Sequence, residues 1–341
     1  MKAIALIESE NHVSARYRLV PFAAALSRRG CSMVLHPVPR GFAGRLRLLK
    51  TLAAFDVVLL QRMLPRGFEL SLMRRAARRL VFDFDDAVFH RDSFHRKGID
   101  STGHERRFAR IACAADSLIA GNRHLADRAI AAGARRESVR VIPTCVEPSR
   151  YVPSVSGESR GLELVWIGSS STLQGLEMRR ELFAKLADHH AGLRLRVICD
   201  RFPGFDRPPI VPVRWSEAGE AGALAAAHVG ISWMPDDEWS KGKCGLKVLQ
   251  YFAAGLPVIA NPVGVHSLMV IPGETGFLAD SDEQWIDAVA RMADAGERKR
   301  MGKSAREFVE AHYSVDRYQN CFANALLGTP ETGNARGAAE V

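Results

Sequence analysis

The sequence lacks the features that would assign it to a membrane-spanning, secreted or disulfide-rich class. No apolar run among its 341 residues approaches the roughly 18 residues that cross a bilayer. The opening segment MKAIALIESE is typical of a strand and carries no signal-peptide cleavage region. The six cysteines show no CxxC spacing, which favours free thiols in a reducing compartment over disulfides or a zinc site. We therefore expect a cytoplasmic protein.

Acidic residues are scarce in the first half of the chain. Residues 1–150 contain 27 Lys and Arg against 14 Asp and Glu, a net charge of +13, whereas the remaining residues contain 20 against 24, a net −4. Such asymmetry indicates that the first half meets something anionic, either a nucleic acid or an anionic membrane surface. No zinc-finger, RNP or basic-zipper pattern is present, so we do not expect nucleic acid.

Two basic segments suit a membrane surface. Residues 41–55 mix cations with leucines, as an interfacial amphipathic helix does. A solvated surface helix would have the same composition, so that alternative stays open. The cations concerned are Arg45, Arg47, Lys50, Arg74, Arg75, Arg78 and Arg79. They predict a peripheral contact with the inner face of the cell membrane.

Short apolar runs alternate with helix-patterned segments along the chain. Six runs precede residue 144, at 3–8, 33–38, 57–61, 80–84, 117–121 and 139–143. A segment rich in Pro and Ser, 144–160, interrupts the alternation, and five more runs follow at 162–168, 193–200, 211–215, 229–235 and 257–260. This pattern predicts two α/β domains with doubly wound parallel sheets, and the 47% hydrophobic content is enough for two cores.

The domain boundaries follow from the same pattern. We expect an N-terminal domain over 1–150, a C-terminal domain over 161–314, a helix over 315–328 and a disordered tail over 329–341. Two open sheets in tandem place a central cleft between them, with ligands at the carboxyl ends of the strands.

One segment carries a specific signal, KCGLKVLQYFAAGLPVIANPVG from Lys243 to Gly264. It predicts a helix whose first turn carries Lys243 and Lys247, with Gly255 as its C-terminal glycine and a short strand after it. A helix N-terminus flanked by lysines attracts anions. An ordinary amphipathic helix with solvated lysines is the alternative.

This segment, with GETGFLA from Gly273, resembles the donor-nucleotide region of the large retaining glycosyltransferase family built from two Rossmann-like domains, the GT-B type known as group 1. The resemblance implies a nucleoside-diphosphate sugar on the second domain, an acceptor on the first and a last helix that crosses back to the first. It also implies retention of configuration without a metal ion or a further cofactor, the diphosphate oxygen assisting departure and attack. The run from Asp236 to Lys247 resembles a sub-branch of this family that acts in polysaccharide and surface-glycan assembly.

The sequence departs from the family pattern at two acidic positions. The family's pair of glutamates, which hold the sugar hydroxyls and the ribose, falls on Gly242 and Gln250. Gln250 can still hydrogen-bond a ribose diol. Without the acids, Lys243 and Lys247 become the expected neutralisers of the diphosphate charge.

Further donor-side candidates come from the second half. Gly168 and Ser169 end a strand and open a helix, where free N–H groups suit a phosphate. Trp215 ends another strand and could pack on a nucleobase, although a core role is the alternative. The full donor set is Gly168, Ser169, Trp215, Lys243, Gly245, Lys247 and Gln250.

Acceptor-side candidates come from the first half. Asp83, Asp85 and Asp86 end an apolar strand, a favoured place for acceptor binding or proton removal, and we name Asp85 and Asp86 as catalytic candidates. A metal on the Asp83 and Asp85 pair is conceivable from their spacing, but the resemblance argues against one. Other strand-end candidates are His12, Arg16, His90, Asn122 and Arg123.

These observations predict a glycosyltransferase that moves a sugar from a nucleoside diphosphate to a lipid-linked or growing glycan acceptor. A nucleotide-sugar 2-epimerase on the same architecture is one alternative. A non-catalytic nucleotide- or nucleic-acid-binding protein is another, favoured by the two missing glutamates.

Overall fold

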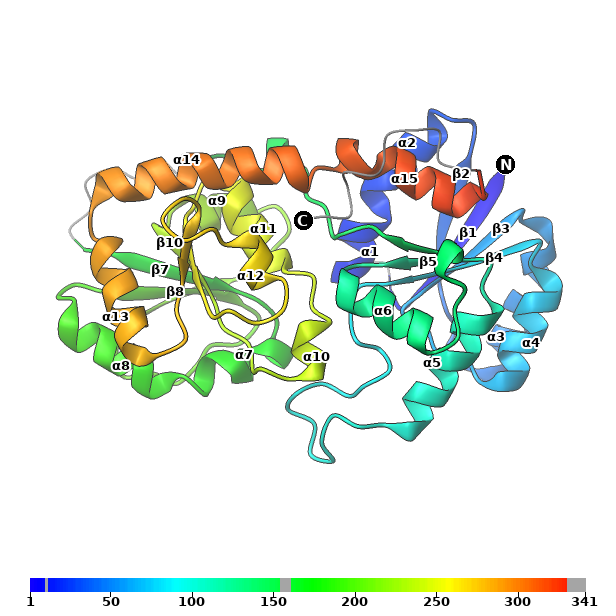
Figure 1. Cartoon of the computed structure of the whole chain (residues 1–341), viewed down its shortest axis with the longest axis horizontal. Coiled ribbons are helices and arrows are strands. Elements are labelled where there is room, and N and C mark those ends of the chain that lie inside the picture. Colours follow the sequence, from blue (N-terminus) through cyan, green and yellow to red (C-terminus); the bar gives the residue numbers. More distant parts are fainter. Residues whose placement is uncertain (10–11, 154–160, 330–341) are drawn as a thin grey trace. The chain divides into compact units, whose positions relative to one another are not determined.

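The computed structural model describes residues 1–9, 12–153 and 161–329 (Figure 1). The described chain divides into two compact units. The first contains residues 1–145, residues 237–244 and the chain from Val315, and the second contains Val146–Asp236 and Gly245–Ser314. Each unit has one six-stranded sheet, and every described strand pairing is parallel. The predicted fold class is therefore confirmed. The predicted tail lies outside the described residues from position 330 onward.

The first sheet has the strand order β2-β1-β3-β4-β5-β6. Its inner strands are apolar along nearly their whole length, and every residue of β3 is buried, because helices cover both faces of a parallel sheet. Its strands are β1 (Lys2–Ile7), β2 (Ser32–Pro37), β3 (Val57–Gln61), β4 (Arg79–Phe84), β5 (Ser117–Ala120) and β6 (Val139–Val141).

Two apolar clusters cover the two faces of the first sheet. One contains Leu48, Leu70, Phe108 and Leu125 from α3 (Phe42–Thr51), α4 (Gly67–Ala76), α5 (Thr102–Ala114) and α6 (Arg123–Ala131). The other contains residues of α1 (Val13–Arg18), α2 (Val20–Ser27) and α15 (Val315–Leu327). Phe22 and Phe322 stack there with ring centroids 4.4 Å apart. The last helix, α15, therefore packs beside α2 in the first unit (Figure 1).

The second sheet has the order β12-β11-β10-β7-β8-β9. Its strands are β7 (Glu163–Ile167), β8 (Arg194–Cys199), β9 (Ile210–Arg214), β10 (Val229–Ser232), β11 (Val258–Ala260) and β12 (Gly276–Leu278). Its helices are α7 (Ser170–Glu177), α8 (Arg180–His189), α9 (Glu220–Ala225), α11 (Leu246–Ala253), α12 (His266–Met269), α13 (Asp282–Arg291) and α14 (Ala295–His312). The short α10 (Glu238–Lys241) belongs to the first unit.

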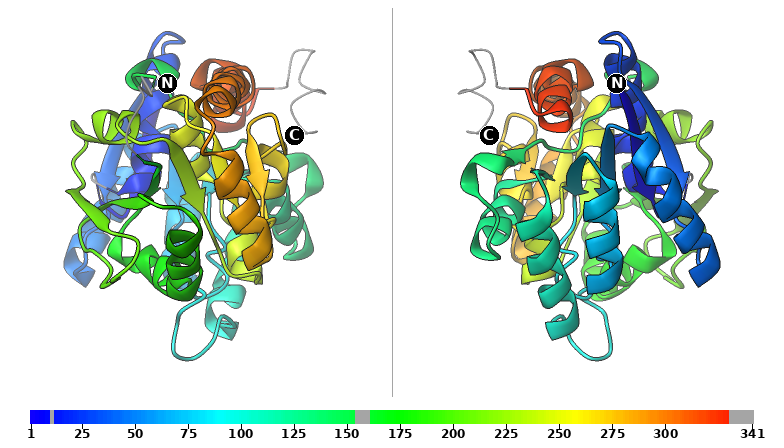
Figure 2. Two further views of the ribbon diagram at one scale, coloured as in Figure 1. Left: turned by 90° about the vertical axis from the view of Figure 1, so that its left-hand side faces the viewer. Right: turned by 90° about the vertical axis from the view of Figure 1, so that its right-hand side faces the viewer.

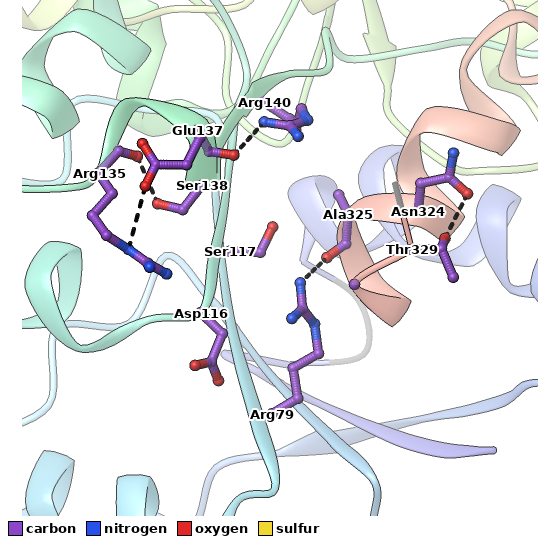
Figure 3. Close-up of a pocket in the computed structure, with 11 residues that line it drawn as sticks. Arg79, Asp116, Ser117, Arg135, Glu137, Ser138, Arg140, Asn324, Ala325 and Thr329 are labelled. Carbon is purple, nitrogen blue, oxygen red and sulfur yellow. Dashed lines mark hydrogen bonds and ion pairs between the residues drawn. The ribbon is translucent and has the colours of Figure 1, made fainter. Parts of the chain in front are cut away.

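A cavity of about 290 Å³ lies in the first unit, where β4, β5 and β6 begin (Figure 3). Arg79 crosses this region and donates hydrogen bonds from Nε to Leu326 O (2.9 Å) and from Nη2 to Ala325 O (3.0 Å). It thereby satisfies carbonyls at the end of α15 that have no partner within the helix. We expected Arg79 on a basic surface face, but its guanidinium binds backbone carbonyls of α15 within the first unit. None of the residues predicted for the donor or acceptor lines this cavity.

Candidate functional site

Polar side chains gather where three neighbouring strands of the first sheet end. Ser14 lies in α1, which follows β1, and Arg62 directly follows β3. Asp85 and Asp86 directly follow β4. Because β1, β3 and β4 are adjacent and parallel, their carboxyl ends share one edge of the sheet, the usual place for a ligand in such folds.

Arg62 joins these side chains. Its Nη1 donates a hydrogen bond to Ser14 Oγ (2.7 Å) and its Nη2 donates one to Asp86 Oδ2 (2.7 Å). Its Nε lies 3.7 Å from Asp85 Oδ1. Sequence reasoning missed this residue, although a single arginine immediately after the apolar run 57–61 was the available signal.

The three carboxylates of the DFDD run have different partners. Asp83 is fully buried and forms a bidentate ion pair with Arg18, with Nη2 to Oδ1 at 2.6 Å and Nε to Oδ2 at 3.0 Å. Asp86 accepts hydrogen bonds from Arg62 and from Lys243 Nζ (3.0 Å). Within the described ranges, no group of three His, Cys, Asp or Glu side chains gathers as a set of metal ligands.

Asp85 differs from its two neighbours in its hydrogen bonding. Among the residues that the structure describes, its buried Oδ1 has no hydrogen-bond partner. Burial alone would raise the pKa of Asp85, but the charges of Arg62 and Arg18 hold that pKa below its usual value. A buried carboxylate oxygen that accepts no hydrogen bond is energetically costly, and a hydroxyl donor would satisfy it.

Residues 237–244, which connect β10 to α11 in the sequence, fold with the first unit. Asn122 Nδ2 donates to the carbonyls of Lys241 (3.1 Å) and Lys243 (2.9 Å), while its Oδ1 accepts from Leu125 N (2.9 Å) and caps α6. Both ends of this amide are therefore occupied. Asn122, predicted on the acceptor side, holds the backbone of the connecting segment.

The position of Lys243 differs from the sequence prediction. We expected it in the first turn of the helix, but α11 begins at Leu246 and only Lys247 lies in its first turn. Gly245 has a left-handed backbone (φ 66°), which separates Lys243 from the helix. The Lys243 ammonium instead contacts Asp86 and lies 4.4 Å from the centre of the Trp239 ring.

Close packing explains one of the two missing glutamates. A Cβ atom placed on Gly242 would lie 2.7 Å from Ala87 Cβ and 2.8 Å from Ala87 N. The adjacent Cys244 is buried in the apolar core of the first unit, and its thiol donates to Asp85 O (3.2 Å). The backbone at Gly242 therefore has no room for an acidic side chain.

The donor candidates at the start of α7 already have an anion beside them. Ser170 N donates a hydrogen bond to Asp200 Oδ1 (2.8 Å). Hydrogen bonds from the side chain and the backbone of Ser170 lower the pKa of Asp200. Ser169 Oγ lies 2.8 Å from Ser171 Oγ, and a Cβ on Gly168 would meet the Trp166 ring. A carboxylate of the protein thus occupies the helix N-terminus where we expected a phosphate.

The other donor candidates lie in α11 and near β9. Lys247 Nζ lies 4.1 Å from the centre of the Trp166 ring, a cation–π geometry. Gln250 is on the same helix and only 5% exposed. Trp215 donates from Nε1 to Glu220 Oε2 (2.8 Å) and is half-buried, so its polar edge is already used.

The remaining acceptor candidates divide by location. His12 caps α1 by accepting from Ser14 N (3.3 Å), and burial, followed by the charge of Arg62, lowers the pKa of His12. His90 is buried, and its pKa is lowered by burial and then by Arg128. Arg123 is exposed and pairs with Asp127 (3.2 Å), and Arg16 lies over the Tyr17 ring. The structure therefore brings His12, but not Arg123, to the edge that holds Arg62.

Comparisons with known proteins place these features in context. Residues 179–323 match the family described as glycosyl transferase-like. The D-inositol 3-phosphate glycosyltransferase of Acidothermus cellulolyticus is 26% identical over 227 residues, which cover 58% of this chain and 50% of that protein. The protein of that name from Corynebacterium glutamicum is 46% identical over 66 residues, which cover 18% of this chain and 16% of that protein. The chain thus spans about half, or less, of the length of these curated relatives.

Solved structures match over nearly the whole chain. Anabaena HepE in complex with UDP and glucose has a TM-score of 0.73 at 16% identity, covering 96% of this chain and 100% of that one. Sucrose-phosphate synthase from Thermosynechococcus elongatus has a TM-score of 0.75 at 15% identity, covering 95% and 98%. The fold implied by the residues after Lys243 is confirmed. The chain has the two-domain GT-B fold of these glycosyltransferases, and its residues 179–323 match the glycosyl transferase-like family.

A first prediction concerns Gly242. Restoring the family's acid with Gly242→Glu should destabilise the protein by about 1–3 kcal/mol, because the side chain must displace the backbone at Ala87. Gly222→Glu is the matched control, since it adds the same charge at a position with nothing within 4 Å. Urea unfolding of both variants measures the difference. Equal stability of the two variants would contradict the packing argument.

Proposed function

We propose that the protein is a glycosyltransferase that moves a sugar from a nucleoside diphosphate to a hydroxyl of a lipid-linked or growing glycan. The match of residues 179–323 to the glycosyl transferase-like family carries this proposal. The likeness to HepE, which was solved with UDP and glucose, supports a nucleoside-diphosphate sugar as the donor. We draw the retaining outcome, the assistance of departure by the diphosphate oxygen and the role in surface-glycan synthesis from the family resemblance.

The donor half of the reaction is proposed for the second unit. Lys247, in the first turn of α11, would neutralise the diphosphate as the bond to the sugar breaks. Gln250 would hydrogen-bond the ribose in place of the family's glutamate. Lys243 is a weaker candidate than the sequence suggested, because its ammonium already neutralises Asp86.

The acceptor half is proposed for the sheet edge that holds Arg62. Asp85 Oδ1, which accepts no hydrogen bond from the residues that the structure describes, would accept the hydrogen bond of the attacking hydroxyl. As the hydroxyl oxygen bonds to the anomeric carbon, its proton passes to Asp85 and the nucleoside diphosphate leaves with the electron pair of the broken bond. Asp86 would support this step through Arg62 rather than by direct contact, since two cations already hold it.

A peripheral membrane contact is proposed for α3 and α4, which lie side by side (Figure 2). Phe42 and Leu46 are 69% and 42% exposed on α3, and Arg47 and Lys50 are exposed on the same helix. Three cations of the predicted membrane-binding set are paired with carboxylates of the protein. These pairs are Arg45 with Glu69, Arg74 with Asp116 and Arg78 with Asp56, so fewer cations remain for a membrane than the sequence predicted. No described helix is long and apolar enough to span a bilayer.

The donor assignment predicts a loss of nucleotide binding. Lys247→Ala should weaken binding of the cognate nucleoside diphosphate by about 1.5–3 kcal/mol, the range for hydrogen bonds to charged groups. Lys303→Ala, at an exposed site of α14, is the control and should bind as the parent does. Calorimetry with uridine, thymidine and guanosine diphosphates gives the affinities. If Lys247→Ala retains full affinity, the donor site lies elsewhere.

The acceptor assignment predicts a loss of transfer without a loss of binding. Asp85→Asn should reduce turnover of a sugar nucleotide about 10²–10⁴-fold, the usual contribution of a general base, and leave the affinity for the donor unchanged. Single-turnover assays with lipid-linked and glycan acceptors measure the rate. Epimerised sugar nucleotide without transfer would indicate the 2-epimerase alternative. Binding without any turnover in the parent would indicate the non-catalytic one.

The membrane assignment predicts salt-dependent binding to anionic vesicles. Reversing Arg47 and Lys50 to Glu should weaken it, because each cation contributes about 1 kcal/mol near an anionic surface. The attraction should fade as salt shortens the Debye length, about 8 Å at physiological strength. Reversing Arg135, an exposed residue outside α3 and α4, is the control. Co-sedimentation that ignores lipid charge would reject this surface.

A further inference from the structure

Arg62 has an unusual backbone. Among the described residues it is the one non-glycine with a positive φ, at 57°. This region is unfavourable for a residue other than glycine, and such residues cluster at functional sites. Its amide donates to Asp83 O (2.8 Å), so the extension of β3 alongside β4 holds this conformation. The strain places the guanidinium at the carboxyl edge of the sheet.

Each of the three guanidinium nitrogens of Arg62 lies next to a different side chain. Nη1 bonds Ser14, Nη2 bonds Asp86 and Nε faces Asp85 at the longer distance of 3.7 Å. Planar fork geometry allows an arginine, and not a lysine, to hold such an arrangement. Asp86 is thereby held by a hydrogen bond, whereas Asp85 Oδ1 has no hydrogen-bond partner among the described residues.

The charges around Asp85 come from several elements. The cations are Arg62 after β3 and Arg18 in α1, and His12 lies at the start of α1. The acids are Asp83 and Asp86 of its own run, and the connecting segment adds Lys243, bound to Asp86, and the buried Cys244. Arg18 is committed to Asp83 by its bidentate pair. Arg62 is therefore the cation whose loss would change the pKa of Asp85 most.

We propose that Arg62 is the positioning residue of the acceptor half-reaction: it holds Asp86 by a hydrogen bond and leaves Asp85 Oδ1 to accept one from the acceptor hydroxyl. The inference rests on the proposed function and adds a residue to it. Arg62 neither takes the proton nor contacts the bond that breaks. It determines which carboxylate receives the proton of the hydroxyl, and its charge keeps that carboxylate ionised before the reaction.

The test compares the pH dependence of turnover in the parent, Arg62→Gln and Arg62→Lys. Activity requires ionised Asp85, so it is present above the pKa of Asp85 and lost below it. Removing the Arg62 charge should raise that pKa, and the acidic limb of kcat should move up by about 1–3 pH units. Arg62→Lys keeps the charge and should move the limb less, while kcat still falls because the fork is lost. Donor affinity should not change in either variant.

Arg62→Gly is the control for folding, because it removes the side chain and also relieves the backbone strain. This variant should be folded, with the parent's nucleotide affinity and the same displaced acidic limb as Arg62→Gln. An acidic limb that stays in place in both variants overturns the inference, and so does a parallel loss of donor binding and turnover. Failure of the proposed function is seen separately, as absence of transfer by the parent with every donor and acceptor.

Discussion

The hydrogen bonds of Arg62 to Ser14 and Asp86 join the carboxyl ends of β1, β3 and β4 into one polar edge. The edge exists because the parallel order of these strands brings three sequence-distant turns together. Four charged groups meet there, Arg62, Lys243, Asp85 and Asp86, and their charges nearly cancel. Asp85 Oδ1 lies 3.7 Å from Arg62 Nε and has no hydrogen-bond partner among the described residues, and we propose it as the acceptor of the substrate hydroxyl's hydrogen bond.

The segment 237–244 extends this edge, although both of its sequence neighbours belong to the second unit. The Asn122 amide holds its backbone, and Lys243 supplies the second cation on Asp86. The close approach of Gly242 to Ala87 excludes the glutamate that the resembling family carries. Position 242 thus has close packing against Ala87 in place of an acidic side chain, and the adjacent Lys243 pairs with Asp86 within the first unit.

The sequence was sufficient to predict the two parallel sheets, because apolar runs separated by helical segments have few other solutions. It also indicated Asp85 and Asp86, since carboxylates after a buried strand stand out. It could not reveal Arg62, whose role depends on strand order and on a backbone conformation that composition does not encode. Lys243 was misplaced for a similar reason, because its partner Asp86 is remote in sequence and the left-handed Gly245 precedes the helix. Gly242 needed the position of Ala87 to be understood.

The central claim is that the first unit receives the acceptor at the Arg62 edge while the second unit receives the nucleotide. Hydrogen–deuterium exchange of the full chain tests it most directly, with a nucleoside diphosphate alone and then with an acceptor added. The account predicts that the nucleotide protects residues 246–253 and that the acceptor adds protection at residues 12–18 and 83–90. Protection of residues 12–18 and 83–90 by the nucleotide alone, or none there from an acceptor that supports turnover, would contradict the account.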